Sequence, residues 1–199
     1  MFLAIIVPLA AYLIGSVSFA VVASKAFHLP DPRAYGSGNP GATNVLRTGN
    51  KAAALVTLAG DGLKGWLAVF VAGRLQNIAG APDWLVPAAA LAVFLGHLYP
   101  VFLRFSGGKG VATVAGIVFA LHWPLGLALL IIWLVMAVGF RISSLAALIS
   151  AVLMPLGGFW VFGNTPRAWV LVPIAALLFW RHRANIRQLV RGKERPIGQ

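Results

Sequence analysis

Residues 110–140 read GVATVAGIVFALHWPLGLALLIIWLVMAVGF, a run of 31 residues without a charged side chain. As one helix this run would be about 46 Å long at 1.5 Å per residue, well beyond the ~30 Å hydrocarbon core of a bilayer. The segment His122-Trp123-Pro124-Leu125-Gly126 lies near its middle and is typical of a turn. The run therefore predicts two short membrane spans joined near His122.

Other stretches with almost no charge predict further spans on either side of this run. They fall at about residues 2–24, 52–73, 84–103, 142–163 and 168–180. The chain is 60% hydrophobic and 10% charged, whereas roughly a quarter of the residues are charged in soluble domains. It contains no cysteine, which excludes a disulfide framework and a thiol nucleophile. We expect an all-α bundle of about seven transmembrane spans, the last of them short, and a first span that is retained rather than cleaved as a signal peptide.

The distribution of Lys and Arg tests the division of the long run, because each added span moves every later loop to the other side. With seven spans, thirteen Lys and Arg side chains lie on one side, and Arg74 and Arg167 alone lie on the other. With six spans the two sides carry seven and eight. The first distribution fits the positive-inside rule, so we expect the N-terminus outside and the C-terminus in the cytoplasm.

The first polar segment reads DPRAYGSGNPGATNVLRTGNK from Asp31 to Lys51. Asn39 followed by Pro40 is typical of an N-cap and a first helical residue, so a short interfacial helix is predicted near 40–48. Glycines before a helix, backed by hydroxyl, amide and guanidinium groups, can bind a phosphate. The candidate ligands are Ser37, Gly38, Asn39, Thr43, Asn44 and Arg47. The alternative is a flexible interfacial loop capped by Asn39.

The second polar segment places Gly107-Gly108-Lys109-Gly110 directly before an expected helix. It is not a nucleotide P-loop, because Leu103 and Gly110 occupy the first and last defined positions of that pattern. Its backbone N–H groups and Lys109 can still bind another anion. The alternative is that the glycines only allow helices to cross closely.

The start of the C-terminal tail places His182 and Asn185 one helical turn apart, on one face. With its ordinary pKa, His182 would titrate near neutrality and could exchange a proton with a substrate. A basic tail that only binds anionic lipid would explain the neighbouring arginines equally well, but not His182 and Asn185.

Asp61 and Lys64 lie three residues apart within the expected span 52–73, on one helix face. Two interpretations stay open, a functional site and a pair that only locks helices together. His122, beside Trp123 and Pro124 at an expected outer turn, is more typical of an interfacial residue than of a catalytic one. His97 is a weaker catalytic candidate than His182, because a lone histidine at a membrane boundary is more often structural.

Three runs, Ser37–Arg47, Gly96–Thr113 and Arg181–Ile186, together resemble the bacterial acyl-phosphate:glycerol-3-phosphate acyltransferases. The resemblance covers essentially the whole chain, in order. It implies a single inner-membrane domain, residues 1–199, with its active site on the cytoplasmic face. Such an enzyme transfers a fatty acyl group from acyl phosphate to the 1-position of glycerol 3-phosphate. The products are lysophosphatidic acid and phosphate, in the first step of phospholipid synthesis. We expect membrane lipids as partners and no cofactor or metal, and the hydropathy of the chain makes nucleic acid the weakest candidate partner.

The resemblance also implies roles for residues. Ser37, Asn39, Thr43, Asn44 and Arg47 would form one phosphate-binding motif, and Gly107, Gly108, Lys109 and Gly110 the other. Ser144, with Ser143 as the alternative, would bind glycerol 3-phosphate together with His182 and Asn185. Lys109, His182 and Asn185 are the expected catalytic residues. As the base for the attacking hydroxyl we rank a phosphate oxygen of acyl phosphate above His182, because the chain has few carboxylates.

Two other classes of protein are alternatives to this interpretation. An anion channel or phosphate transporter would also use arginines and glycines, but the expected anion motifs lie on one face only. A metal-dependent phospholipid phosphotransferase would need clustered carboxylates. The four acidic residues, Asp31, Asp61, Asp83 and Glu194, are scattered along the sequence.

Overall fold

The computed structural model describes residues 2–197, and every regular element in that range is a helix. In chain order the helices are α1 (Phe2–Gly15), α2 (Phe19–Ala26), α3 (Ala42–Leu46), α4 (Lys51–Ala79), α5 (Leu85–Leu98), η1 (Val101–Leu103), α6 (Val111–Leu121), α7 (Trp123–Phe140), α8 (Ser143–Phe162), α9 (Pro166–Trp169), α10 (Leu171–Arg181) and α11 (Arg183–Val190). The predicted all-α class is confirmed.

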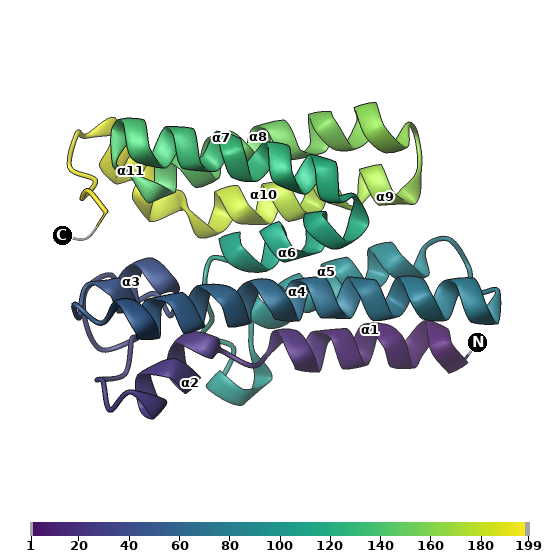
Figure 1. The fold of residues 1–199 in the computed structure, drawn as a ribbon, viewed down its shortest axis with the longest axis horizontal. Coiled ribbons are helices and arrows are strands. Elements are labelled where there is room, and N and C mark those ends of the chain that lie inside the picture. Colours follow the sequence, from purple (N-terminus) through teal and green to yellow (C-terminus); the bar gives the residue numbers. More distant parts are fainter. Residues whose placement is uncertain (1, 198–199) are drawn as a thin grey trace.

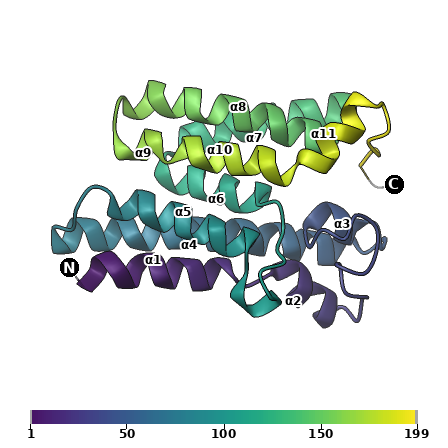
Figure 2. The same ribbon diagram turned by 180° about the vertical axis from the view of Figure 1, so that it is seen from behind.

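The helices form two layers with α6 between them (Figure 1). One layer contains α1, α4 and α5, and the other contains α7, α8 and α10; the reverse view shows the same arrangement (Figure 2). Helix α6 packs on α4 in the first layer and on α7 in the second. Helices α3 and α11 lie at one end of the bundle, which we call the loop end, and the N-terminus lies at the opposite end.

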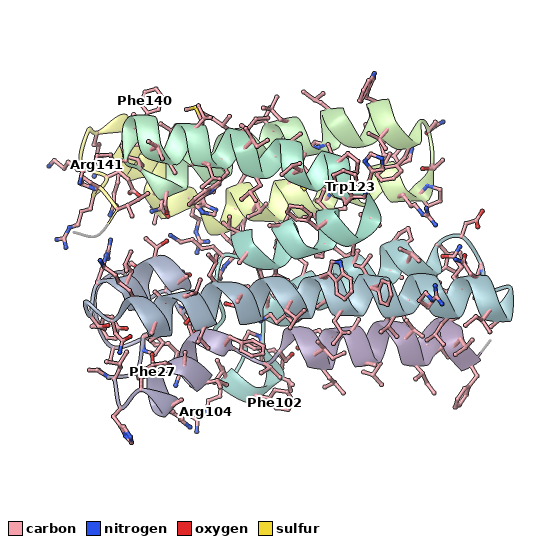
Figure 3. All side chains as sticks on the ribbon, in the orientation of Figure 1. Phe27, Phe102, Arg104, Trp123, Phe140 and Arg141 are labelled. Atoms are coloured by element: carbon pink, nitrogen blue, oxygen red, sulfur yellow. The ribbon has the colours of Figure 1, made fainter. Side chains whose placement is uncertain are left out.

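The long apolar run is divided where its length predicts. Helix α6 ends at Leu121 and α7 begins at Trp123. His122 takes an extended conformation, and its Nδ1 accepts a hydrogen bond from the N–H of Leu125 at 3.2 Å, so the histidine caps α7. Trp123 and Arg141 stand at opposite ends of α7, and Arg141 lies at the loop end (Figure 3).

The helices are not seven spans of equal length. Four segments are long and apolar enough to cross a membrane, namely Lys51–Ala79, Leu85–Leu103, Trp123–Phe140 and Ser143–Phe162, and the pair α1 and α2, bent by 41°, makes a fifth if it counts as one span. Helices α6 and α10 have 11 residues each, which gives about 16 Å against a core of ~30 Å. The count of seven therefore stays a prediction that depends on these two short helices.

The buried pair Asp61 and Lys64 satisfies the backbone at the break between α1 and α2. Lys64 Nζ lies 2.7 Å from Asp61 Oδ1 and donates a hydrogen bond to the carbonyl of Val17 at 2.6 Å. The N–H of Phe19 donates to Asp61 Oδ1 at 3.4 Å. A broken helix at membrane depth requires partners for its freed backbone groups, and this pair supplies them.

The predicted interfacial helix exists but is shorter than residues 40–48. Helix α3 begins at Ala42, and its N-cap is Gly41 rather than Asn39, so the predicted cap was wrong. Gly41 is extended, with φ −158° and ψ 163°, and its N–H donates to the carbonyl of Asn39 at 2.9 Å. This turn around Pro40 leaves the Asn39 side chain outside the helix.

Helices α4 and α6 meet through glycines. A Cβ added to Gly116 would collide with the carbonyl of Gly62, and a Cβ on Gly65 would collide with the carbonyl of Thr113. The two backbones are therefore in direct contact, the arrangement that small residues allow in membrane bundles. This contact fixes α6 and the segment that precedes it.

We expect Gly116→Ala to destabilise the protein by about 1–3 kcal/mol, because the added methyl overfills the contact with α4. The measurement is the midpoint of thermal unfolding in detergent, which should fall by several degrees. Gly139→Ala on α7 is the matched control, since no described atom lies within 4 Å of the added Cβ. Equal midpoints for the two variants would contradict the close contact.

Candidate active site

A cavity of about 540 Å³ between the two layers brings most of the predicted site residues together. Its polar lining consists mainly of Ser37, Asn39, Thr43, Asn44, Arg47, Lys109, Gly110, Ser143, Ser144, His182 and Asn185. Its apolar lining comes from α4, α6, α7 and α8 and includes Leu58, Val118, Leu130, Trp133 and Met154. One cavity thus joins a polar region that contains Arg47 and Lys109 to an apolar groove.

Three of the predicted phosphate-binding glycines, Gly38, Gly107 and Gly108, do not line the cavity. Arg181 donates to the carbonyls of Gly107 and Gly108, at 2.7 and 3.1 Å. The N–H of Gly108 donates to the carbonyl of His97 at 3.1 Å, so it is not available to an anion. These two glycines hold the loop in place, while Lys109 and Gly110 face the cavity.

In the first motif, Arg47 and Asn44 differ in their contacts. Arg47 lines the cavity, and its Nε is buried without a hydrogen-bond partner in the described part of the chain. The Asn44 amide is used within the protein, because Nδ2 donates to the carbonyls of Pro32 (2.7 Å) and Tyr35 (3.2 Å). Its Oδ1 accepts from the N–H of Ser37 at 2.9 Å. Asn44 therefore stabilises the loop, whereas the Nε–H of Arg47 can donate a hydrogen bond to a bound anion.

Lys109 and Asn185 approach each other although 76 residues separate them. Lys109 Nζ donates to Asn185 Oδ1 at 2.5 Å. Burial lowers the pKa of Lys109 to about 8; the charge of Glu194 opposes this shift, and the charges of Arg181 and Arg47 add to it. The ammonium is therefore available at neutral pH but titrates within a biochemically accessible range.

His182 is buried at the junction of α10 and α11. Its Nδ1 lies 2.8 Å from the carbonyl of Leu178. Because a carbonyl only accepts, the neutral ring carries its proton on Nδ1 and leaves Nε2 as an acceptor. Burial lowers the pKa of His182 to about 4, with further lowering from the charges of Lys109 and Arg181. The expectation that His182 titrates near neutrality was wrong, because its burial could not be seen in the sequence.

Glu194 belongs to the site and was missed as a site residue by sequence reasoning. Its Oε1 accepts hydrogen bonds from Ser144 Oγ at 2.6 Å and from Asn185 Nδ2 at 2.5 Å. The tail reaches this position because the N–H of Ile197 donates to the carbonyl of Arg141 at 2.7 Å. The available signal was that Glu194 is the one acid in the basic sequence after Arg181.

Two helix N-termini reinforce the positive character of the polar region. Helix α6 begins at Val111, beside Lys109 and Gly110, and α8 begins at Ser143. The first N–H groups of a helix have no intrahelical partners and carry a partial positive charge. Across the layers, Thr43 Oγ1 lies 3.4 Å from Ser143 Oγ, which brings the first motif to the start of α8. This region can hold anions from both sides.

Comparison with known proteins gives one consistent family. The family model described as glycerol-3-phosphate acyltransferase matches residues 5–192. The glycerol-3-phosphate acyltransferase of Burkholderia ambifaria is 59% identical over 192 residues, which cover 96% of this chain and 89% of the relative. The glycerol-3-phosphate acyltransferase of Paraburkholderia phymatum is 58% identical over 194 residues, which cover 98% of this chain and 92% of the relative.

Solved structures agree with the sequence relatives. The crystal structure of PlsY (YgiH), an integral membrane glycerol 3-phosphate acyltransferase, in its glycerol 3-phosphate form has a TM-score of 0.90 and 36% identity. The match covers 98% of this chain and 96% of that one. The lysophosphatidic acid form of the same protein has a TM-score of 0.88 and 35% identity, and the match covers 97% of this chain and 94% of that one. The chain therefore belongs to the glycerol-3-phosphate acyltransferase family of integral membrane proteins, the family that its motifs resemble.

Proposed function

We propose that the chain transfers a fatty acyl group from acyl phosphate to the 1-position hydroxyl of glycerol 3-phosphate. The products are lysophosphatidic acid and inorganic phosphate. The observation that carries the proposal is the single cavity whose polar region holds Arg47 and Lys109 and whose remaining lining is apolar. The related structures support it, since their two forms are named for the acceptor and the product of this reaction.

The cavity suits an acyl donor that arrives from the bilayer. Leu55 and Leu58 of α4 line it and are 65% and 52% exposed, so its apolar part opens sideways between α4 and α7. A donor in the bilayer can then place its chain along this groove and its phosphate in the polar region. Binding of the chain also holds the reacting carbonyl in place, which lowers the entropic part of the barrier.

We assign the two substrate phosphates to the two anion-binding features. Arg47, with Ser37, Asn39 and Thr43, binds one, while Lys109, with Gly110 and the start of α6, binds the other. Ser144 or Ser143, His182 and Asn185 bind glycerol 3-phosphate. Asn44 keeps these groups in register through its three backbone hydrogen bonds.

The chemistry asks little acid or base strength of the protein. The 1-hydroxyl oxygen attacks the acyl carbonyl carbon, an ester C–O bond forms, and the bond between that carbon and the phosphate oxygen breaks. The leaving phosphate keeps the electron pair and accepts the hydroxyl proton on an oxygen. A histidine with a pKa of about 4 is a weak base, which favours phosphate as the acceptor of that proton. Lys109 and Arg47 stabilise the charge that develops.

The same proposal includes the topology. Seven crossings result if α6, α10 and the bent pair α1 and α2 each count as a span beside α4, α5, α7 and α8. The chain is then one domain, residues 1–199, in the bacterial inner membrane, with the N-terminus outside and the loop end in the cytoplasm. The excess of Lys and Arg on the loop-end side supports this orientation.

The test mixes purified protein with acyl phosphate and glycerol 3-phosphate and measures lysophosphatidic acid and phosphate, which should appear in equal amounts. We expect Lys109→Ala and Arg47→Ala each to lower kcat/KM by about 10- to 100-fold or more, since each removes a charged partner of a phosphate. Lys51→Ala is the matched control, because Lys51 begins α4 at the loop end but does not line the cavity. Product from acyl-CoA alone would refute the donor, and no product from acyl phosphate would refute the proposal.

The pH dependence follows from Lys109. Its ammonium is protonated below about pH 8 and neutral above, so phosphate binding is retained below pH 8 and lost as the pH rises through that value. We expect a descending limb of kcat/KM near pH 8, since kcat/KM reports groups of the free enzyme. Lys109→Arg should move this limb to higher pH, because a guanidinium stays charged. An unchanged limb in this variant would assign it to another group.

His182→Gln tests the assignment of the base. We expect turnover at saturating substrates to fall by less than ~10⁴-fold, because His182 binds and orients the acceptor but does not accept its proton. Glycerol 3-phosphate binding, measured by thermal stabilisation of the same preparation, is the control for a binding defect. A larger fall in turnover with binding intact would make His182 the base.

A further inference from the structure

A buried cluster of Asp61, Lys64 and His97 lies next to the loop Gly107–Gly110, which we call the glycine loop. Their exposed fractions are 2%, 3% and 6%. His97 Nδ1 lies 3.6 Å from Asp61 Oδ1 and has no hydrogen-bond partner in the described part of the chain. The Asp61 carboxylate therefore faces the Nδ1 edge of the imidazole, slightly beyond hydrogen-bond distance. Ionisable side chains within membrane spans are costly to bury, so a cluster of three requires a reason.

Lys64 and His97 differ in what they contact. Lys64 bonds to Val17 at the helix break and does not line the cavity. Asp61 and His97 both line the cavity. The cluster thus has a structural side, at Lys64, and a side that faces the site, at His97.

His97 supports the glycine loop twice. Its carbonyl accepts the Gly108 N–H at 3.1 Å. Its ring lies against Gly108 so closely that a Cβ added there would collide with His97 Nε2. From the other layer, Arg181 holds the carbonyls of Gly107 and Gly108. The loop is therefore clamped between the end of α5 and the end of α10, and Lys109 follows directly.

We propose that Asp61 and His97 are positioning residues for phosphate binding: Asp61 orients the His97 ring, and the ring sets the position of Gly108 and hence of Lys109 and Gly110. The proposal rests on the proposed function for the identity of the ligand, a substrate phosphate on this loop. Neither residue needs to touch the substrate. Lys64 acts one step further away, as the counter-charge of Asp61 and the partner of the helix break.

A cluster that only held helices together would affect stability alone. A positioning role predicts in addition a loss of kcat/KM, because a shift of about 1 Å in a positioned group can cost up to ~100-fold in rate. The useful readout is therefore the KM of each substrate beside kcat and the unfolding midpoint.

We expect His97→Ala to lower kcat/KM for one phosphorylated substrate by about 10- to 100-fold, with a higher KM and a lower kcat, because Lys109 both binds the phosphate and stabilises the developing charge. His97→Gln should restore part of this loss, since its amide reaches towards the Nε2 position. Val93→Ala is the matched control, because Val93 is fully buried on the same helix and does not line the cavity. It should leave both KM values within twofold. If His97→Ala does not fold, the comparison is made between His97→Gln and Val93→Ala.

A second measurement tests the contact itself. Gly108→Ala forces a methyl onto the imidazole, but in a His97→Ala background the methyl has the space that the ring has vacated. The double variant should therefore have a lower KM than the product of the two single effects predicts. If the effects of the two substitutions on KM multiply strictly, the contact with His97 is not the cause of the Gly108→Ala effect, and the proposal is overturned.

The proposal fails if His97→Ala and Lys64→Met lower the unfolding midpoint alike and both leave each KM within twofold. Failure of the proposed function is distinguished by the wild-type protein, which then makes no lysophosphatidic acid from acyl phosphate. In that case inorganic phosphate serves as the probe, and its stabilisation of the wild type against heat is compared with that of His97→Gln. Weaker stabilisation of the variant supports the positioning role, and equal stabilisation overturns it.

Discussion

Arg181 connects the two layers of the bundle at the point where the site is built. Its guanidinium donates to two consecutive carbonyls of the glycine loop and lies over the ring of Tyr99, 5.7 Å from its centroid. A planar group with several fixed donors suits this task better than an ammonium would. Because the loop precedes α6, and α6 lies between the layers, this contact sets where Lys109 meets the groups on α8, α10 and α11.

The site relies on balanced charge rather than on strong acids or bases. Arg47 and Lys109 provide positive charge, and Glu194 partly offsets it through its contacts with Ser144 and Asn185. A positive cavity without any counter-charge would lower the pKa of Lys109 further and reduce the ammonium available to a phosphate. The carboxylate therefore helps to keep a buried lysine charged, and its hydrogen bonds hold two side chains that line the cavity.

The features that sequence could predict depend on length, composition and local pattern. The division near His122 follows from the length of one apolar run, and the motifs containing Arg47 and Lys109 indicated where the cavity would lie. The features it could not predict depend on tertiary contacts. The pKa of His182 is low because the side chain is buried, and Glu194 reaches the site only because the tail folds back onto Arg141. The predicted start of α3 was wrong because Gly41, which is extended, is the N-cap in place of Asn39. Asn44 contacts three backbone groups that no local pattern brings together.

The shortness of α6 affects where the chemistry occurs. The helix rises only about 16 Å from Val111 to Leu121, and it begins well inside the bundle rather than at the loop end (Figure 1). The turn that follows it exposes Trp123, a residue type that favours the membrane–water boundary. A helix of this length crosses only about half of a ~30 Å hydrocarbon core, so α6 depends on the preceding loop, which carries Lys109, to connect it to the loop end. The short helix thereby holds Lys109 beside the apolar groove, so that one cavity offers a cation and a hydrocarbon-lined surface side by side.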